Sequence, residues 1–159
     1  MKDPEHRPWR VVESQYLSHE PWFTVRREAV ELPNGARIPA WYVLEYPDWV
    51  NVIARTRDGR FLFIDQYRHA LGRTSYEIVA GVCDPQDASP LAAAQRELYE
   101  ETGYGGGRWE PYMVLSANPT SHNNLTHTFL ATDVEPVSSQ HPEATEDIRV
   151  HLFSFEEVH

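Results

Sequence analysis

Three glutamates, Glu97, Glu100 and Glu101, lie within the short stretch RELYEET and could together bind a cation. On a helix they fall within one arc of about 100°. Like charges three and four positions apart repel by about 0.2–0.5 kcal/mol per pair, so this spacing costs stability unless positive charge is supplied. Carboxylate oxygens are ligands of Mg²⁺, which commonly shares them with substrate phosphates. On these residues alone, a solvated acidic helix face is the alternative to a metal site.

The element that positions the three carboxylates is predicted to be a helix. Ser89 is suited to cap it, Pro90 to its first turn and Gly103 to its end. An apolar stripe runs along the segment and lies about a quarter-turn from the glutamates. The stripe consists of Leu91, Ala94 and Leu98. We therefore expect the carboxylates at the edge of the core, where partial desolvation would create a need for positive charge.

Segments rich in aromatic and β-branched residues predict strands on both sides of this helix. Asn34-Gly35 and Asp58-Gly59 predict hairpin turns between neighbouring strands. The expected strands span 9–17, 22–32, 37–46, 49–55, 60–68, 75–81, 110–117, 124–132 and 147–155. This order predicts an α/β domain in which helices cover a mixed sheet, with residues 1–47 as an added antiparallel β extension. The final SFEE is a possible capping box, but the chain ends before a helix is expected to form.

The bulk composition limits the classes of function. With 159 residues, the chain suits a single domain over 1–159 with a sizeable core. A net charge of −10 argues against nonspecific binding to nucleic acid or to anionic membranes, and no apolar run approaches membrane-spanning length. The single Cys83 fits a reducing compartment, and the first ten residues lack the apolar segment of a secretory signal. Cytoplasm is the expected location.

The longer stretch GVCDPQDASPLAAAQRELYEETGY, residues 81–104, closely resembles the Nudix box. The second half of that pattern, from Arg96 to Tyr104, matches throughout, with an aromatic residue at the last position. In the first half, Gly81 and the acidic Asp87 each lie one residue earlier than the family pattern places its Gly and its first Glu. A one-residue insertion in the loop would explain both offsets, and whether Asp87 replaces that Glu is left open.

The resemblance implies a Nudix-type α/β/α sandwich and a metal-dependent hydrolase. It assigns the binding of Mg²⁺ or Mn²⁺ to Glu97, Glu100 and Glu101, with the backbone carbonyl of Ala80 as a further ligand. Arg96 is expected to be a structural partner of its neighbours. In such enzymes the metal polarises a water that attacks one phosphorus and stabilises the charge on the phosphate oxygens.

The flanking run QYRHALGRTSYEIVAG resembles the segment before the box in ADP-ribose and ADP-sugar pyrophosphatases, with Val79 in place of the usual Pro. This resemblance implies a substrate-contacting Arg68 and an acidic Glu77 that faces the site. The N-terminal third resembles the same subfamily, whose extra strands commonly build a homodimer. Trp22 and Trp41 correspond to aromatic residues that stack on the base in some relatives, although tryptophans are more often core or interface residues.

Residues 143–158 resemble the segment after a mobile loop of ADP-ribose pyrophosphatases, and that loop often carries a glutamate proposed as the general base. Glu146 is the best match for that base and Glu143 the second, against the alternative of solvated loop carboxylates. His122 and His127 have no Cys or carboxylate nearby in the sequence, so a polar loop entering a strand is a better interpretation than a metal site. Thr120 follows Pro119 where the family more often has Gly.

The leading functional hypothesis is hydrolysis of the pyrophosphate bond in a small nucleotide substrate, ADP-ribose or a related nucleotide sugar. A Nudix hydrolase of other nucleotides, such as nucleoside di- or triphosphates, is the first alternative. The second is a module that senses a nucleotide sugar without cleaving it. Retention of all three box glutamates favours catalysis over sensing.

Overall fold

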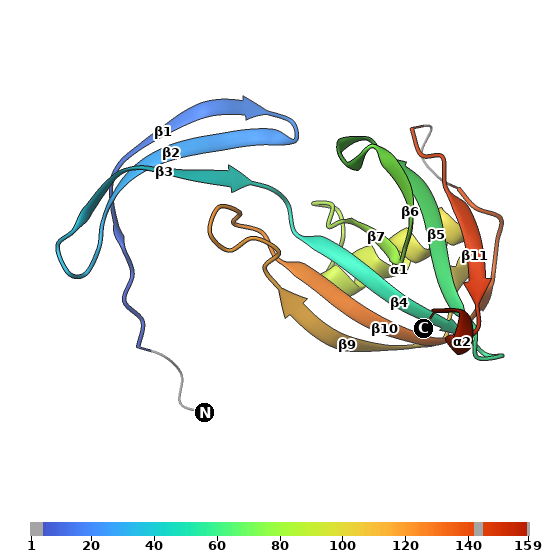
Figure 1. The fold of residues 1–159 in the computed structure, drawn as a ribbon. Coiled ribbons are helices and arrows are strands. Elements are labelled where there is room, and N and C mark those ends of the chain that lie inside the picture. Colours follow the sequence, from blue (N-terminus) through green and yellow to red (C-terminus); the bar gives the residue numbers. More distant parts are fainter. Residues whose placement is uncertain (1–4, 142–144, 159) are drawn as a thin grey trace. The chain divides into compact units, whose positions relative to one another are not determined.

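A computed structural model describes residues 5–141 and 145–158 of the chain, which form two compact units (Figure 1). Of the described residues, the first unit comprises 5–46 and 116–124, and the second comprises 47–115, 125–141 and 145–158. No helix in the described ranges is long and apolar enough to cross a membrane.

The first unit contains a three-stranded antiparallel sheet in the order β1-β2-β3. Its strands are β1 (Arg10–Glu20), β2 (Phe23–Glu31) and β3 (Arg37–Glu45). The predicted turn at Asn34-Gly35 is present, with Gly35 at a φ of 84° and the Asn34 side chain accepting a hydrogen bond from the Ala36 N–H. Strand β1 runs further than the sequence predicted. Its cross-strand pairing with β2 continues to the tight turn before Phe23.

The second unit is built on an eight-stranded mixed sheet in which β11, β5, β4, β10 and β8 are successive neighbours. Strands β4 and β10 are parallel, whereas the other pairs are antiparallel. The expected mixed α/β fold is therefore confirmed. The strands are β4 (Trp49–Thr56), β5 (Phe61–Arg68), β6 (Arg73–Glu77), β7 (Val79–Val82), β8 (Tyr104–Gly105), β9 (Arg108–Leu115), β10 (Thr126–Pro136) and β11 (Arg149–Phe153), and the 3₁₀ turn η1 (His69–Leu71) joins β5 to β6.

The hydrophobic core lies between this sheet and helix α1 (Pro90–Thr102), which packs against β4 and β7 (Figure 1). In β4 every second side chain from Val50 onward is buried, as expected for a strand with one face on the core. Leu98 and Ala94 of the predicted apolar stripe are completely buried, and Leu91 packs against them from the edge. The predicted helix caps are also present, because the Ser89 Oγ accepts from the Ala92 N–H at 3.2 Å and Gly103 has a φ of 73°.

Two predictions of secondary structure were wrong. The single strand expected over 75–81 is two strands that separate at Ile78, because β6 pairs with β5 whereas β7 pairs with β4. The second wrong prediction was that the chain ends before a helix forms, because a terminal helical turn, α2 (Phe155–Val158), is present. It begins with the predicted capping box, in which the Ser154 N–H donates to the Glu157 carboxylate at 2.7 Å and the Glu157 N–H donates to the Ser154 Oγ at 3.3 Å.

Candidate active site

Helix α1 places its three glutamates in different environments. The Glu100 side chain is 40% exposed and that of Glu97 only 12%, whereas Glu101 as a residue is 2% exposed. Glu101 lies one helical turn after the buried Leu98, so its side chain points beneath the helix toward the sheet. The expectation that these carboxylates lie at the edge of the core is confirmed, and Glu101 lies well inside that edge.

Arg96 holds the acidic segment together. Its guanidinium contacts both carboxylate oxygens of Asp87, at 3.2 and 2.9 Å, and donates to the Val82 carbonyl at 2.9 Å. Its Nη1 lies 3.0 Å from an oxygen of Glu97 and 3.0 Å from an oxygen of Glu100. The pKa of Asp87 is lowered chiefly by the hydrogen bonds from Arg96. Asp87 thus pairs with the arginine of the box despite its offset in sequence, and the structural role predicted for Arg96 is supported.

The buried carboxylates lack sufficient positive charge. The pKa of Glu101 is raised to about 8, chiefly by burial and also by the charges of Glu97 and Glu146, while the Ala80 N–H and Arg68 oppose the rise. Burial likewise raises the pKa of Glu97, although Arg96 opposes the shift. The Oε2 atom of Glu101 is buried and has no hydrogen-bond partner among the described residues. A cation next to this oxygen would compensate the charge, so the donor set fits a hard divalent ion.

The carboxylates are not gathered around one point. Across residues 5–141 and 145–158, no three His, Cys, Asp or Glu side chains are placed to hold a metal ion. Glu97 and Glu100 both turn to the same nitrogen of Arg96. Ala80 lies in β7 opposite Asn51, and its N–H acts on the carboxylate of Glu101, which places the predicted backbone ligand beside that glutamate.

The structure brings Arg68, Glu77 and Glu146 into the same neighbourhood. Arg68 at the end of β5 forms a forked ion pair with Glu77 of β6, in which Nη2 lies 2.6 Å from Oε2 and Nε lies 3.0 Å from the same oxygen. The hydrogen bonds to Glu77 raise the pKa of Arg68, and Glu101 and Glu146 contribute through their charges. Glu146 also acts on Glu97. The second candidate base, Glu143, lies outside the described residues.

The two predicted aromatic contacts lie in the first unit, whereas the glutamates lie in the second. Trp22 occupies the turn between β1 and β2, has a φ of 62° and is 61% exposed. Trp41 of β3 is half-buried and packs edge-on against Trp9, with ring centroids 5.1 Å apart. Their predicted contact with a base therefore stays a prediction.

The acidic partner of His127 could not be predicted from the residues near it in the sequence. The His127 Nε2 lies 2.9 Å from the Asp48 Oδ2, and the Asp48 Oδ1 accepts from the Leu125 N–H at 2.8 Å. Asp48 is 79 positions away in sequence, and only the parallel pairing of β4 with β10 brings the two residues together. His122 instead stacks on Tyr46 in the first unit, with ring centroids 5.5 Å apart.

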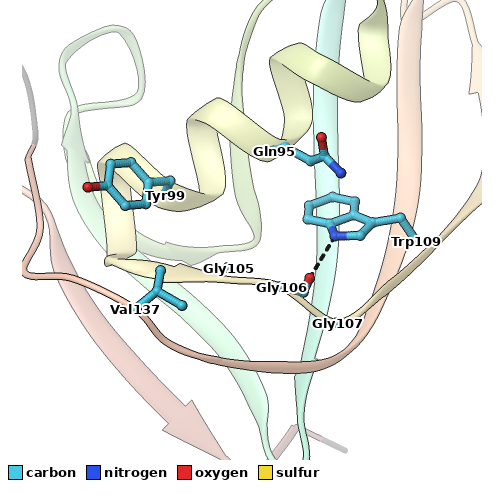
Figure 2. Close-up of a pocket in the computed structure, with 7 residues that line it drawn as sticks. All are labelled: Gln95, Tyr99, Gly105, Gly106, Gly107, Trp109 and Val137. Carbon is cyan, nitrogen blue, oxygen red and sulfur yellow. Dashed lines mark hydrogen bonds between the residues drawn. The ribbon is translucent and has the colours of Figure 1, made fainter.

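A pocket on another side of α1 contains none of the predicted site residues. It lies between the helix and the glycine turn from β8 to β9, and the Trp109 Nε1–H closes this turn by donating to the Gly106 carbonyl at 2.9 Å (Figure 2). Its lining residues are Gln95, Tyr99, Gly105, Gly106, Gly107, Trp109 and Val137. Gln95 and Tyr99 are the two that lie on α1, and neither Glu97 nor Glu101 lines this pocket.

Comparison with known families supports the interpretation of the box. A model of the NUDIX domain matches residues 45–159, and a model of the nucleoside diphosphate sugar hydrolase N-terminal domain matches residues 9–44. The boundary between the two matches falls at the end of β3, close to the boundary between the two structural units. The predicted resemblance is confirmed.

Three similar proteins have names that refer to ADP-ribose or to ADP compounds. An ADP-ribose pyrophosphatase of Mycobacterium tuberculosis (strain ATCC 25618 / H37Rv) is 31% identical over 136 residues, covering 86% of this chain and 64% of its own length. An ADP-ribose pyrophosphatase of Bacillus subtilis (strain 168) is 35% identical over 107 residues, covering 67% and 57%. The chain thus spans less than two thirds of either relative. A crystal structure of an ADP compounds hydrolase shares the fold, with a TM-score of 0.82, 21% identity, and coverage of 97% of this chain and 82% of that one.

Proposed function

Because the chain belongs to the NUDIX domain family, we propose that it is a metal-dependent hydrolase of the pyrophosphate bond in a nucleoside diphosphate linked to another group. The favoured substrate is ADP-ribose or a related nucleotide sugar, in line with the names of the relatives and with the match at residues 9–44. A cytoplasmic location is part of the proposal.

The observation that carries the proposal is the buried carboxylate of Glu101. A carboxyl with a pKa near 8 and a buried oxygen without a partner among the described residues is costly unless a cation compensates it. Glu97, Glu100 and Glu101, with the carbonyl of Ala80, would hold Mg²⁺ or Mn²⁺. When bound, these ions would supply the electrophilic stabilisation of phosphate charge and the acidification of water that hydrolysis requires.

The remaining residues would bind the substrate and move the proton. The planar guanidinium of Arg68, which pairs with Glu77, suits forked contacts to phosphate oxygens. The Glu146 carboxylate would accept the proton of the attacking water. Trp22 and Trp41 would stack on the base.

The first unit supports a homodimer as part of the same proposal. Its β1 strand is exposed along almost its whole length, and Val30 is the single buried hydrophobic residue among the described residues of this unit. The exposed side chains include Val11, Val12, Tyr16, Leu17, Phe23 and Tyr42. A sheet with this much exposed apolar surface requires a cover, and a second copy of the chain would supply it.

Light scattering on Leu17→Arg should then report a monomer and on Val158→Arg a dimer, whereas a wild-type monomer would overturn the assignment.

The test of activity is hydrolysis of a panel with Mg²⁺ or Mn²⁺. The panel comprises ADP-ribose, ADP-glucose, GDP-mannose, UDP-glucose and nucleoside di- and triphosphates, with products scored by a coupled phosphatase blanked against each substrate. Metal-dependent cleavage of a diphosphate sugar that Glu100→Gln abolishes would support the proposal. Turnover of only di- or triphosphates would reassign the substrate. Tight binding without turnover would replace hydrolysis with sensing.

A further inference from the structure

Residues 137–141, called the strap below, form hydrogen bonds with the C-terminal end of helix α1. The Val137 and Ser138 N–H groups donate to the Gly103 carbonyl at 2.9 and 3.1 Å, and the His141 N–H donates to the Glu100 carbonyl at 2.8 Å. These carbonyls belong to the last turn, where a helix leaves its acceptors without partners of its own. The strap therefore replaces partners that the helix itself cannot provide.

Two features show that the strap is fitted closely to the helix. A Cβ built on Gly103 would stand 2.4 Å from the Ser138 carbonyl oxygen, so the close approach of the strap requires a glycine there. The His141 ring stacks on Tyr99 with centroids 5.7 Å apart, and its Nε2 lies 3.0 Å from the Ser138 Oγ. Backbone and side-chain contacts thus fasten the same five residues.

Gln140 is the member of the strap that reaches two segments at once. Its side-chain amide donates to the Glu101 carbonyl at 2.6 Å and lies 3.5 Å from the Ile148 carbonyl. Glu101 carries the buried carboxylate of the site. Ile148 is buried in the core cluster and follows Glu146 by two positions. One amide therefore joins the backbone of a proposed metal ligand to the segment that carries the proposed general base.

We propose that Gln140 is a positioning residue, which sets the distance between the carboxylate of Glu146 and the site formed by Glu97 and Glu101. The inference rests on the proposed function, since it requires Glu146 to act in hydrolysis. Gln140 contacts neither substrate nor metal in this assignment and acts through the backbone at Ile148. A displacement of about 1 Å at a reacting group can lower a rate by about 100-fold, so even a partial loss of the tether should be measurable.

The test compares Gln140→Met, which keeps the length of the side chain without its donor, with Gln140→Lys, which restores a donor toward two carbonyls. Gln95→Met, on the exposed side of α1, is the matched control. We expect Gln140→Met to lower kcat about tenfold with KM within twofold of wild type. Gln140→Lys should recover most of this loss, and Gln95→Met should behave as wild type. Equal kcat in Gln140→Met and wild type would overturn the inference, and so would a failure of Gln140→Lys to recover activity.

Coupling to Glu146 is measured with the double variant. If Gln140 acts through Glu146, Gln140→Met combined with Glu146→Gln should be no slower than Glu146→Gln alone within about twofold, whereas independent effects would multiply. Multiplying losses, or a Glu146→Gln variant as fast as wild type, would overturn the inference while leaving hydrolysis intact.

Hydrogen exchange of the metal-free protein gives a readout independent of activity. The amides of residues 145–150 should exchange several-fold faster in Gln140→Met and return toward wild type in Gln140→Lys. Unchanged exchange would contradict a tether. If the wild type hydrolyses nothing, the proposed function and the positioning role fail together, and faster exchange would then show only a structural tether.

Discussion

The carboxyl group of Glu97 occupies the space that a side chain on Gly81 would need. A Cβ built on Gly81 would stand 2.0 Å from the Glu97 Cδ and 2.1 Å from its Oε1. Gly81 lies in β7 opposite Val50, so the missing side chain lets a carboxylate of α1 rest directly on the strand. The glycine that stands one residue early in the box is therefore the one on which Glu97 rests.

Gly81→Ala should displace Glu97 and thereby weaken metal binding. We expect Mg²⁺-dependent activity to fall about 100-fold or more, because the clash involves a carboxyl already held between strand and Arg96. Gly105→Ala is the control. Its Cβ would meet the end of the exposed Val137 side chain at 3.1 Å, and it should keep activity within about twofold. Metal titration by calorimetry would check the reason, and unchanged affinity in Gly81→Ala would contradict it.

The stability of the metal-free protein should fall as pH rises from about 4.5 to about 8. The pKa of Glu101 is raised from 4.5 to about 8, so in this window the folded state binds a proton that the unfolded state has lost. Deprotonation therefore favours unfolding, and the loss is complete above about pH 8. Glu101→Gln, which stays neutral, should unfold several degrees higher than wild type at pH 8.5 in EDTA and at a similar temperature at pH 4.5.

Saturating Mg²⁺ should reverse the order of these two proteins at pH 8.5. A cation that binds the folded state alone stabilises the wild type by mass action, whereas Glu101→Gln has lost a ligand. Thermal unfolding from pH 4.5 to 8.5, with EDTA or with Mg²⁺, checks both expectations. Parallel curves for wild type and variant in EDTA would show that Glu101 does not titrate as described.

Replacement of Arg96 should cost more stability than loss of its main partner. Arg96→Gln leaves Asp87, Glu97 and Glu100 without their shared donor, and we expect a loss of about 2–3 kcal/mol of unfolding free energy, allowing for partial exposure of the guanidinium. Asp87→Asn removes one ion pair and should cost about 1 kcal/mol. Arg96→Lys should behave more like Arg96→Gln, because an ammonium cannot reproduce the fork on Asp87. Urea denaturation measures all three, and a lysine variant as stable as wild type would contradict this account.

Asp48 should contribute to stability through two separable contacts. Asp48→Ala removes the acceptor of the Leu125 N–H and the partner of His127, at an expected cost of about 2 kcal/mol. Asp48→Asn can keep a carbonyl oxygen for Leu125, so about half of that loss is expected. Denaturant midpoints of the two variants, with equal slopes, would test the ranking. Equal losses would indicate that the His127 contact carries the whole effect.

The sequence by itself determined the local features of the site. The caps Ser89 and Gly103, the apolar stripe and the spacing of the glutamates depend on neighbours within a few residues, and such short-range rules can be read without a fold. Segments rich in aromatic and β-branched residues likewise predicted most of the strands. The box pattern then indicated the family and the identity of the candidate ligands.

Only the tertiary structure decided how the three carboxylates differ and what surrounds them. Glu101 is buried and Glu100 is not because the sheet covers one side of α1, and this cover is set by strand order. The split of the strand at Ile78 depends on which neighbour each half pairs with. The Asp48–His127 contact and the Gln140 bridge join residues that the topology brings together. Such long-range contacts cannot be predicted from residue spacing in the sequence, because they arise from packing and not from local conformational preference.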